Sequence, residues 1–131
     1  MRKYLDDIGV TDRPDTWCAG KNDPRKMSWH EQRDIYGFDF RELWNLDYTF
    51  YLWLYEHLMA YKEQSSVYID LSTKQYDYNG KMVSQMDLID MMLDRLLFSF
   101  SDKYHEDNAD QYAYVHETEK IWAFILPAMW N

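Results

Sequence analysis

The stretch GFDFRELWNLDYTFYLWLYEHLMAY, residues 37–61, constrains the fold more than any other part of the chain. Large apolar side chains recur in it at spacings of three and four residues, the pattern of one face of an α-helix; they are Leu46, Phe50, Trp53, Leu54, Leu58 and Tyr61. Tyr48, Tyr51 and Tyr55 lie off this stripe, so aromatic side chains surround much of the helix. A helix of this kind packs on several sides. We therefore expect a central helix over residues 39–63, with Asn45 or Asp39 as the cap at its start, whose aromatic side chains are mostly core.

The N-terminal part of the chain predicts little regular structure. Residues 9–28 have neither helical nor strand periodicity and hold two of the three prolines, so we expect an ordered arm or loop over residues 1–28. Ser28 and Glu31 then have the spacing of a capping box. They predict a short helix that ends at Gly37.

Residues 66–83 change from a helical period to a period of two. Val67, Ile69 and Leu71 alternate with other side chains, and the pair Asn79-Gly80 is a strong signal for a hairpin turn. We expect a small antiparallel sheet of two or three strands. A sheet of this size needs helices to pack against.

Two further helices are expected over residues 84–101 and 109–130. Ser84 and Asp87 have the spacing of a second capping box, and Pro127 ends or kinks the last helix. The predicted fold class is α+β, as one domain over residues 1–131. It has a mainly helical body of three to four helices and one small sheet of two or three antiparallel strands.

The net charge of −9 is unevenly distributed along the 131 residues. Residues 1–41 hold eight acids and eight bases, whereas residues 42–131 hold fifteen acids and six bases. An acidic surface repels nucleic acid and anionic membranes and attracts basic partners, so we expect no direct nucleic-acid or membrane binding. The chain has no signal-peptide run, no apolar stretch near about 18 residues and one cysteine, Cys18. We expect a cytoplasmic protein without an internal disulfide.

Acidic residues concentrate between positions 84 and 110, where seven acids stand against two bases. They are Asp87, Asp90, Asp94, Asp102, Glu106, Asp107 and Asp110. The first three have helical spacing and share one face of the predicted helix. One interpretation is an ordinary solvated helix face. The other is an acidic recognition surface for the basic groove of a nucleic-acid-handling protein.

A small-ligand site is the alternative hypothesis. Tyrosine and tryptophan rings stack well on flat ligands such as nucleobases, and arginine binds phosphates. Arg41, Trp44, Asp47 and Tyr48 lie together near the start of the aromatic helix. They would form the site of a nucleotide-signal binder, although aromatic residues at helical spacing more often pack in a core.

Catalytic motifs are weak. Each of the four histidines is adjacent to a glutamate, but neighbours in sequence do not face each other on a helix. The chain has no H-E-x-x-H, no G-x-S-x-G and no glycine-rich phosphate loop. We therefore expect no enzyme, no cofactor and no metal site, and a metal-dependent hydrolase built from histidines and acids is the third hypothesis.

Residues 36–97 resemble a group of small proteins encoded by bacteriophages and prophages of Gram-positive bacteria. The shared pattern is Gly-Phe/Trp-Asp followed by Trp-x-Leu-Asp-x-Thr-Phe-x-x-Trp-Leu. It is carried here by Gly37, Phe38, Asp39, Trp44, Leu46, Asp47, Thr49, Phe50, Trp53 and Leu54. No activity is assigned to the group, so the resemblance implies only a small accessory protein of a mobile element.

These observations predict a non-enzymatic accessory protein. It would bind a basic surface of a host or phage protein through its acids and inhibit a nucleic-acid-processing or defence complex. The apolar C-terminal segment WAFILPAMWN fits either a core or a homodimer face on the last helix.

Overall fold

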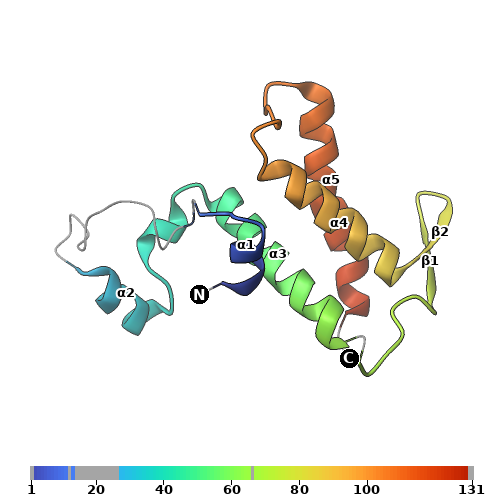
Figure 1. Ribbon diagram of the computed structural model, residues 1–131, viewed down its shortest axis with the longest axis horizontal. Helices are drawn as coiled ribbons and strands as arrows, with labels where there is room; N and C mark the ends of the chain where they lie inside the picture. The colour runs from blue at the N-terminus through green and yellow to red at the C-terminus, as the bar shows by residue number, and fades with distance from the viewer. Residues whose placement is uncertain (1, 12, 14–26, 66, 130–131) are drawn as a thin grey trace. The chain divides into compact units, whose positions relative to one another are not determined.

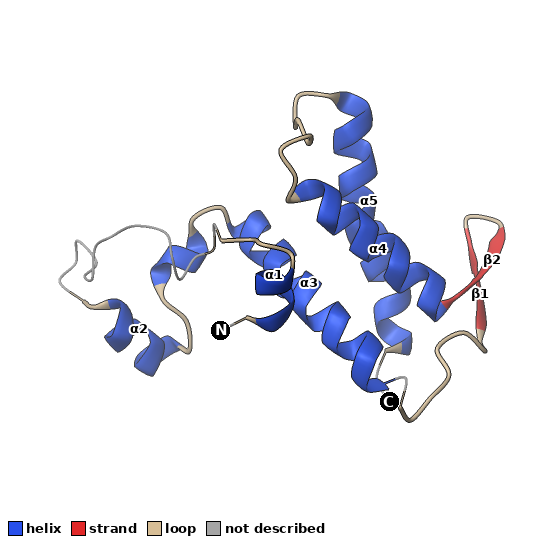
Figure 2. Cartoon of the chain, in the orientation of Figure 1, coloured by secondary structure: helices blue, strands red, loops and turns tan. Residues whose placement is uncertain are grey.

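The protein is mainly helical and contains one two-stranded antiparallel sheet, which confirms the α+β fold class (Figures 1 and 2). The computed structural model describes residues 2–11, 13, 27–65 and 67–129. The chain divides into two compact units, Met1–Glu56 and His57–Asn131, which we call the N-terminal and the C-terminal unit. Helix α3 runs from the first into the second. A single domain over the whole chain stays a prediction.

The N-terminal unit begins with a short helix inside the segment that we expected to be an arm or loop. Helix α1 spans Lys3–Asp7, and Tyr4 and Leu5 are buried. The backbone N–H groups of these two residues donate to the Glu56 carboxylate on α3, at 3.3 and 2.8 Å. This contact fixes α1 on α3. Residues 14–26 of the expected arm, which include Cys18, lie outside the described residues.

Helix α2 spans Trp29–Tyr36 and confirms the predicted capping box. The Ser28 hydroxyl accepts the Glu31 N–H at 3.0 Å, and the Glu31 carboxylate accepts the Ser28 N–H at 3.3 Å. The helix ends as expected at Gly37, whose φ of +84° lies in the left-handed region that favours glycine.

The central aromatic helix begins later than predicted. Asp39 instead starts a short 3₁₀ helix, η1, over Phe40–Leu43, and Asn45 adopts a positive φ of +51° that separates η1 from α3. Helix α3 then spans Leu46–Ser65. The start at residue 39 is therefore wrong, because the capping box at Asp39 belongs to η1, whereas the alternative residue Asn45 directly precedes α3.

The buried face of α3 also differs from the predicted stripe. Leu54 and Leu58 are buried as expected, but Leu46 and Trp53 are 59% and 43% exposed. The side chains buried beside Leu54 and Leu58 are Tyr51, Leu52 and Tyr55. A helix that is apolar nearly all round does not reveal by its sequence which side its neighbours cover.

The sheet in the C-terminal unit is a two-residue hairpin, as the Asn79-Gly80 pair predicts. Strands β1 (Gln75–Tyr78) and β2 (Lys81–Ser84) pair in antiparallel register with Tyr76 opposite Val83. Asn79 and Gly80 both have positive φ, the conformation of a type I′ turn.

No third strand forms among the described residues of this unit. Residues 67–73 are turns and irregular backbone, and Val67 and Tyr68 are 73% and 85% exposed. Only Leu71 is buried there, and its carbonyl accepts the Met86 N–H at 3.1 Å. The strand predicted from the alternation of Val67, Ile69 and Leu71 therefore does not form, because no neighbouring backbone pairs with it.

Two helices make up most of the C-terminal unit. Helices α4 (Gln85–Ser99) and α5 (Ala109–Ile125) pack side by side, and the 3₁₀ helix η2 (Leu126–Ala128) follows, with Pro127 in its first turn (Figure 1). The predicted capping box of Ser84 and Asp87 starts α4. Aliphatic side chains fill this core; they are Leu88, Ile89, Met92, Leu96, Val115, Ile121 and Ile125. Among the described residues, no helix has both the length and the apolar character to span a membrane.

Candidate functional site

The seven acidic residues that we singled out all lie in the C-terminal unit, but they do not form one surface. Asp87, Asp90 and Asp94 are on α4, whereas the other four lie in the loop that follows α4 and in the first turn of α5. A helix of 15 residues is about 22 Å long. Asp87 and the loop acids therefore lie at opposite ends of α4.

Two of the three acids on α4 are engaged within the protein. The Asp87 carboxylate accepts the Ser84 N–H at 3.0 Å, and this backbone hydrogen bond lowers the pKa of Asp87. Asp90 forms an ion pair with Lys62 on α3, with 2.7 Å between Oδ1 and Nζ. Asp94 is exposed. The helical spacing of these acids thus reflects a cap and an ion pair as much as a recognition face.

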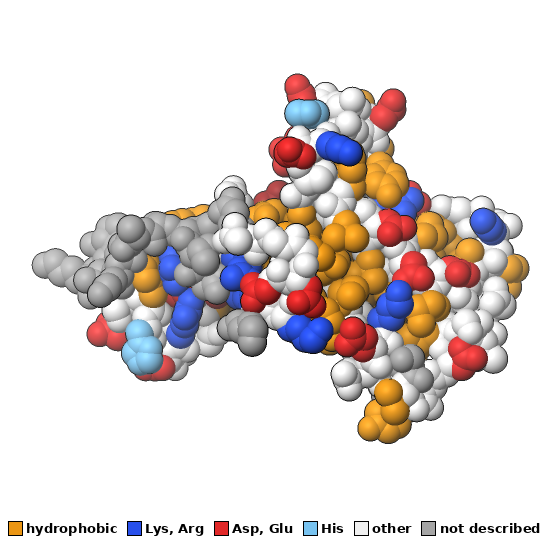
Figure 3. All heavy atoms as spheres, in the orientation of Figure 1, with side chains coloured by type: hydrophobic (Ala, Val, Ile, Leu, Met, Phe, Trp, Pro, Cys, Tyr) orange, Lys and Arg blue, Asp and Glu red, His pale blue; other side chains and the backbone are white. Residues whose placement is uncertain are grey.

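The other acids form a cluster at the α4–α5 turn, which we call the acidic end. Its members are Asp102, Glu106, Asp107 and Asp110. All four are exposed, and Lys103 is the one base among residues 100–111. Figure 3 shows carboxylates gathered over this end of the two helices.

Several internal hydrogen bonds hold the backbone of the acidic end. The Asn108 side chain caps α5 by accepting the N–H groups of Asp110 and Gln111, both at 3.1 Å. The Gln111 side chain in turn accepts the His105 N–H at 2.7 Å. The acids are therefore carried on an ordered turn.

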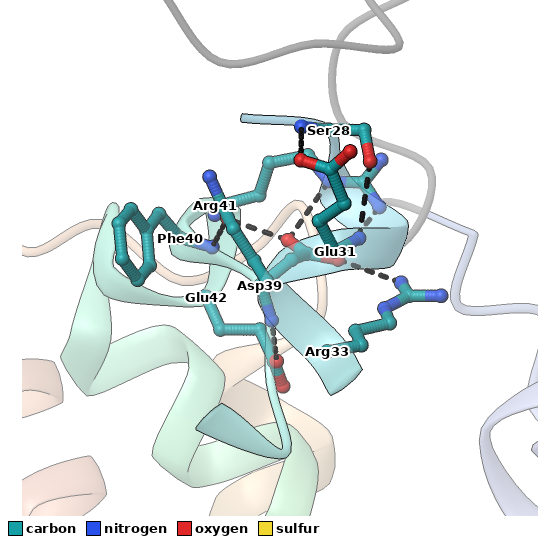
Figure 4. A network of polar contacts seen from close by, with 8 residues as sticks. Ser28, Glu31, Arg33, Asp39, Phe40, Arg41 and Glu42 are labelled. Atoms are coloured by element: carbon teal, nitrogen blue, oxygen red, sulfur yellow. Dashed lines mark hydrogen bonds and ion pairs between the residues drawn. The ribbon is translucent and has the colours of Figure 1, made fainter. Parts of the chain in front are cut away.

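Arg41, which we proposed as a phosphate ligand, is instead part of a buried ion-pair network in the N-terminal unit (Figure 4). Asp39 is fully buried, and its carboxylate accepts Nε and Nη2 of Arg41 at 3.0 and 2.8 Å. Arg33 approaches the same carboxylate at 2.7 Å. The Arg41 guanidinium also lies over the Trp29 ring, 5.0 Å from its centre.

The electrostatics of this network favour the ionised form of Asp39. Burial by itself raises the pKa of the carboxyl, but the hydrogen bonds and positive charges of Arg41 and Arg33 outweigh it. The pKa of Asp39 is therefore below its usual value. The positive charge of Arg41 therefore neutralises the buried Asp39 carboxylate.

The other three members of the alternative site differ in their exposure and in their contacts. Trp44 packs edge-on against Trp29, with 6.1 Å between ring centres, and is 46% exposed. Asp47 is exposed in the first turn of α3, where the negative charge of a carboxylate interacts favourably with the helix dipole. Tyr48 is half-buried.

The C-terminal unit contains a shallow hollow that no sequence motif predicted. It measures about 280 Å³ and lies beside β1, where Lys74, Tyr76 and Gln85 contribute to its lining. The Lys74 amine is 5.4 Å from the centre of the Tyr76 ring. The Gln85 side chain already accepts the Tyr61 hydroxyl at 3.0 Å, so part of its polar surface is satisfied internally.

The histidine-based hypothesis finds no assembled ligand set in the part of the chain that the structure describes. No group of three or more His, Cys, Asp or Glu side chains lies close enough there to hold a metal ion. His116 Nδ1 instead lies 2.9 Å from Glu119 on the same helix.

Comparison with known protein families, curated proteins and solved structures yields no match to this chain. The relation to phage proteins therefore stays a hypothesis that rests on the sequence pattern alone. Two residues of that pattern have clear structural roles in this chain: Gly37 is the left-handed helix cap, and Asp39 is the buried ion-pair partner of Arg33 and Arg41.

Proposed function

We propose that this protein is a non-enzymatic binding protein whose acidic end contacts a basic surface of a host or phage protein. The observation that carries the proposal is the set of four exposed carboxylates on an ordered, capped turn, with one lysine among them. Inhibition of a nucleic-acid-processing or defence complex follows from the phage-like sequence pattern and is part of the same proposal.

The arrangement suits recognition by charge. Exposed carboxylates speed up the encounter with a basic partner and reject other acidic surfaces. A turn that its own hydrogen bonds already hold loses little conformational freedom on binding. Asp94, exposed about one and a half turns before α4 ends, extends the negative charge along the same helix pair.

A pull-down of the tagged protein from host lysate tests the proposal. The eluate is read by mass spectrometry at about 0.1 M and about 1 M salt, where the screening length falls from about 10 to about 3 Å. We expect a basic protein that is retained at low salt and released at high salt. The variant Asp107→Lys/Asp110→Lys should lose it.

The matched control is Asp7→Lys/Glu63→Lys, which changes the net charge equally at exposed residues that do not belong to the acidic end. This variant should retain the partner. Equal loss of the partner from both variants would show that only net charge matters. A partner that stays bound to Asp107→Lys/Asp110→Lys would contradict the role of the acidic end.

A further inference from the structure

The turn of the hairpin carries an asparagine–glycine pair that is open to solvent. Asn79 and Gly80 join β1 to β2, and both residues are exposed (Figure 2). Asparagine is thermolabile, because the backbone nitrogen of the following residue can attack its side-chain amide. A glycine in the following position has no side chain to hinder this attack. The sequence contains the pair once, so the turn is a candidate site for spontaneous deamidation.

The reaction needs water as its only co-reactant. The Gly80 nitrogen loses its proton and forms a bond to Cγ of Asn79, and the amide C–N bond of the side chain breaks as ammonia leaves with that proton. Water then opens the resulting five-membered succinimide at one of its two carbonyl groups. The products are aspartate, or isoaspartate, in which the main chain runs through Cβ and Cγ. Either product adds one negative charge to the hairpin at neutral pH.

The conformation of the turn opposes this ring closure. Asn79 and Gly80 have φ of +54° and +84°, as in a type I′ turn, where ψ of the first residue is about +30°. In the succinimide, Cβ of Asn79 and the Gly80 nitrogen must be nearly eclipsed about the bond from Cα to the carbonyl carbon. Substituents of Cα are about 120° apart, so a ψ of about +30° holds these two atoms at least about 90° from that position. The backbone therefore has to leave the turn conformation before the nitrogen can attack.

The Asp77 side chain adds a second restraint. Its Oδ1 atom accepts the Gly80 N–H, with 2.9 Å between oxygen and nitrogen. This hydrogen bond stabilises the protonated nitrogen, and the negative charge of the carboxylate disfavours the amide anion that attacks Asn79. The contact spans three residues across the turn, so it is lost when the turn opens.

The hairpin is in turn attached to α5. The Tyr78 hydroxyl donates to Oε1 of Glu117 at 3.1 Å, and the Tyr78 ring lies 5.2 Å from the centre of the Phe124 ring. Isoaspartate at position 79 lengthens the main chain of a two-residue turn by one atom, and the type I′ geometry does not accommodate this atom. Deamidation would therefore loosen both the strand pairing and the contact of the hairpin with α5.

We propose that Asn79 is a site of spontaneous deamidation that the folded hairpin protects, and that Asp77 protects it by holding the Gly80 N–H. The reaction is slow in the folded protein and proceeds when the hairpin opens locally. The inference does not rest on the proposed function, because it requires no partner.

The rate of deamidation in the full-length protein tests the proposal. The protein is incubated at neutral pH and digested briefly with trypsin, which cleaves after Lys74 and Lys81 and releases residues 75–81 as one peptide. Mass spectrometry then follows the deamidated fraction of this peptide. We expect the reaction to be at least about tenfold slower in the folded protein than in a synthetic peptide of the same residues.

Two variants separate the hydrogen bond from the turn itself. Asp77→Ala should speed up deamidation of the protein at least about threefold and change the rate of the matching synthetic peptide by less than about twofold. The control Gln75→Ala alters another exposed residue on the same face of β1 and should stay within about twofold of the wild type.

Hydrogen exchange over residues 75–84 identifies a variant whose hairpin has opened. If Asp77→Ala opens it, Asp77→Asn supplies the test, because it keeps an oxygen that can accept the Gly80 N–H and should react more slowly than Asp77→Ala. The proposal is overturned if the folded wild type reacts as fast as the synthetic peptide, or if Asp77→Ala reacts no faster than the wild type. It is also overturned if Gln75→Ala or Asp77→Asn reacts as fast as Asp77→Ala.

Discussion

The N-terminal unit contains a buried ion-pair network, whereas α4 and α5 of the C-terminal unit meet mainly through aliphatic side chains, with one part-buried ion pair between Arg95 and Glu117. Asp39, Arg41 and Gln32 are buried polar residues of the first unit. In the second, Leu88, Met92 and Leu96 of α4 are fully buried. Aliphatic packing stabilises a fold without directing it strongly, while a buried charge accepts few partners and positions.

The two kinds of burial hold different side chains in place. In the N-terminal unit, the buried Asp39 carboxylate holds the side chains of Arg41 and Arg33. In the C-terminal unit, α4 and α5 form a stable base, and the acids lie on the turn at their end. We infer that polar burial serves to position side chains in the first unit, and that apolar burial serves to support a charged turn in the second.

The largest effect is expected for Asp39→Ala. It leaves Arg41 buried without its carboxylate, which should lower the free energy of unfolding of the N-terminal unit by about 4 kcal/mol. Amide hydrogen exchange read by mass spectrometry should show loss of protection over residues 28–44 and little change over residues 85–125. Arg33→Ala, at a half-exposed partner, should cost about 1 kcal/mol or less. If Asp39→Ala and Arg33→Ala lowered the free energy of unfolding equally, burial of the charged group would not explain the size of the effect.

A smaller and opposite pattern is expected for Leu96→Ala. Removing this fully buried side chain should cost about 3 kcal/mol through lost burial and a cavity. Hydrogen exchange should then rise over residues 85–125 and change little over residues 28–44. The matched control Leu97→Ala, at a neighbouring side chain that is 39% exposed, should cost clearly less. If Leu96→Ala loosened both segments equally, the two units would unfold as one.

The smallest effect is expected from mild acid. Asp39 has a lowered pKa in the folded protein. As the pH falls below about 4, the Asp39 carboxylate therefore binds a proton more readily in the unfolded chain than in the folded protein, and this favours unfolding. The contribution of Asp39 is complete above that pH and is lost as pH falls through the folded pKa. Thermal melts between pH 5 and pH 3 should therefore show a steeper loss of stability in the wild type than in Asp39→Asn. Identical slopes would show that Asp39 titrates as an ordinary carboxyl.

Part of the candidate surfaces followed from the sequence. The exposure of Asp102, Glu106, Asp107 and Asp110 is what a polar stretch between two helical patterns predicts, and all four are exposed. Their separation from Asp87 was not foreseen, because distance along the chain does not show that a helix of about 22 Å lies between them. The short 3₁₀ helix over Phe40–Leu43 was not foreseen either, because residues 39–45 were expected to belong to the central helix.

Local chemistry in the sequence determined the elements that depend on neighbouring residues. The capping boxes at Ser28 and Ser84 and the Asn79-Gly80 turn all form as predicted, because their hydrogen bonds and backbone angles involve residues within three positions. Tertiary structure alone decided which face of α3 is buried, whether Val67 enters a strand and which carboxylate Arg33 meets. Each of these depends on a partner from another element, and the free energy of burial is set by that partner.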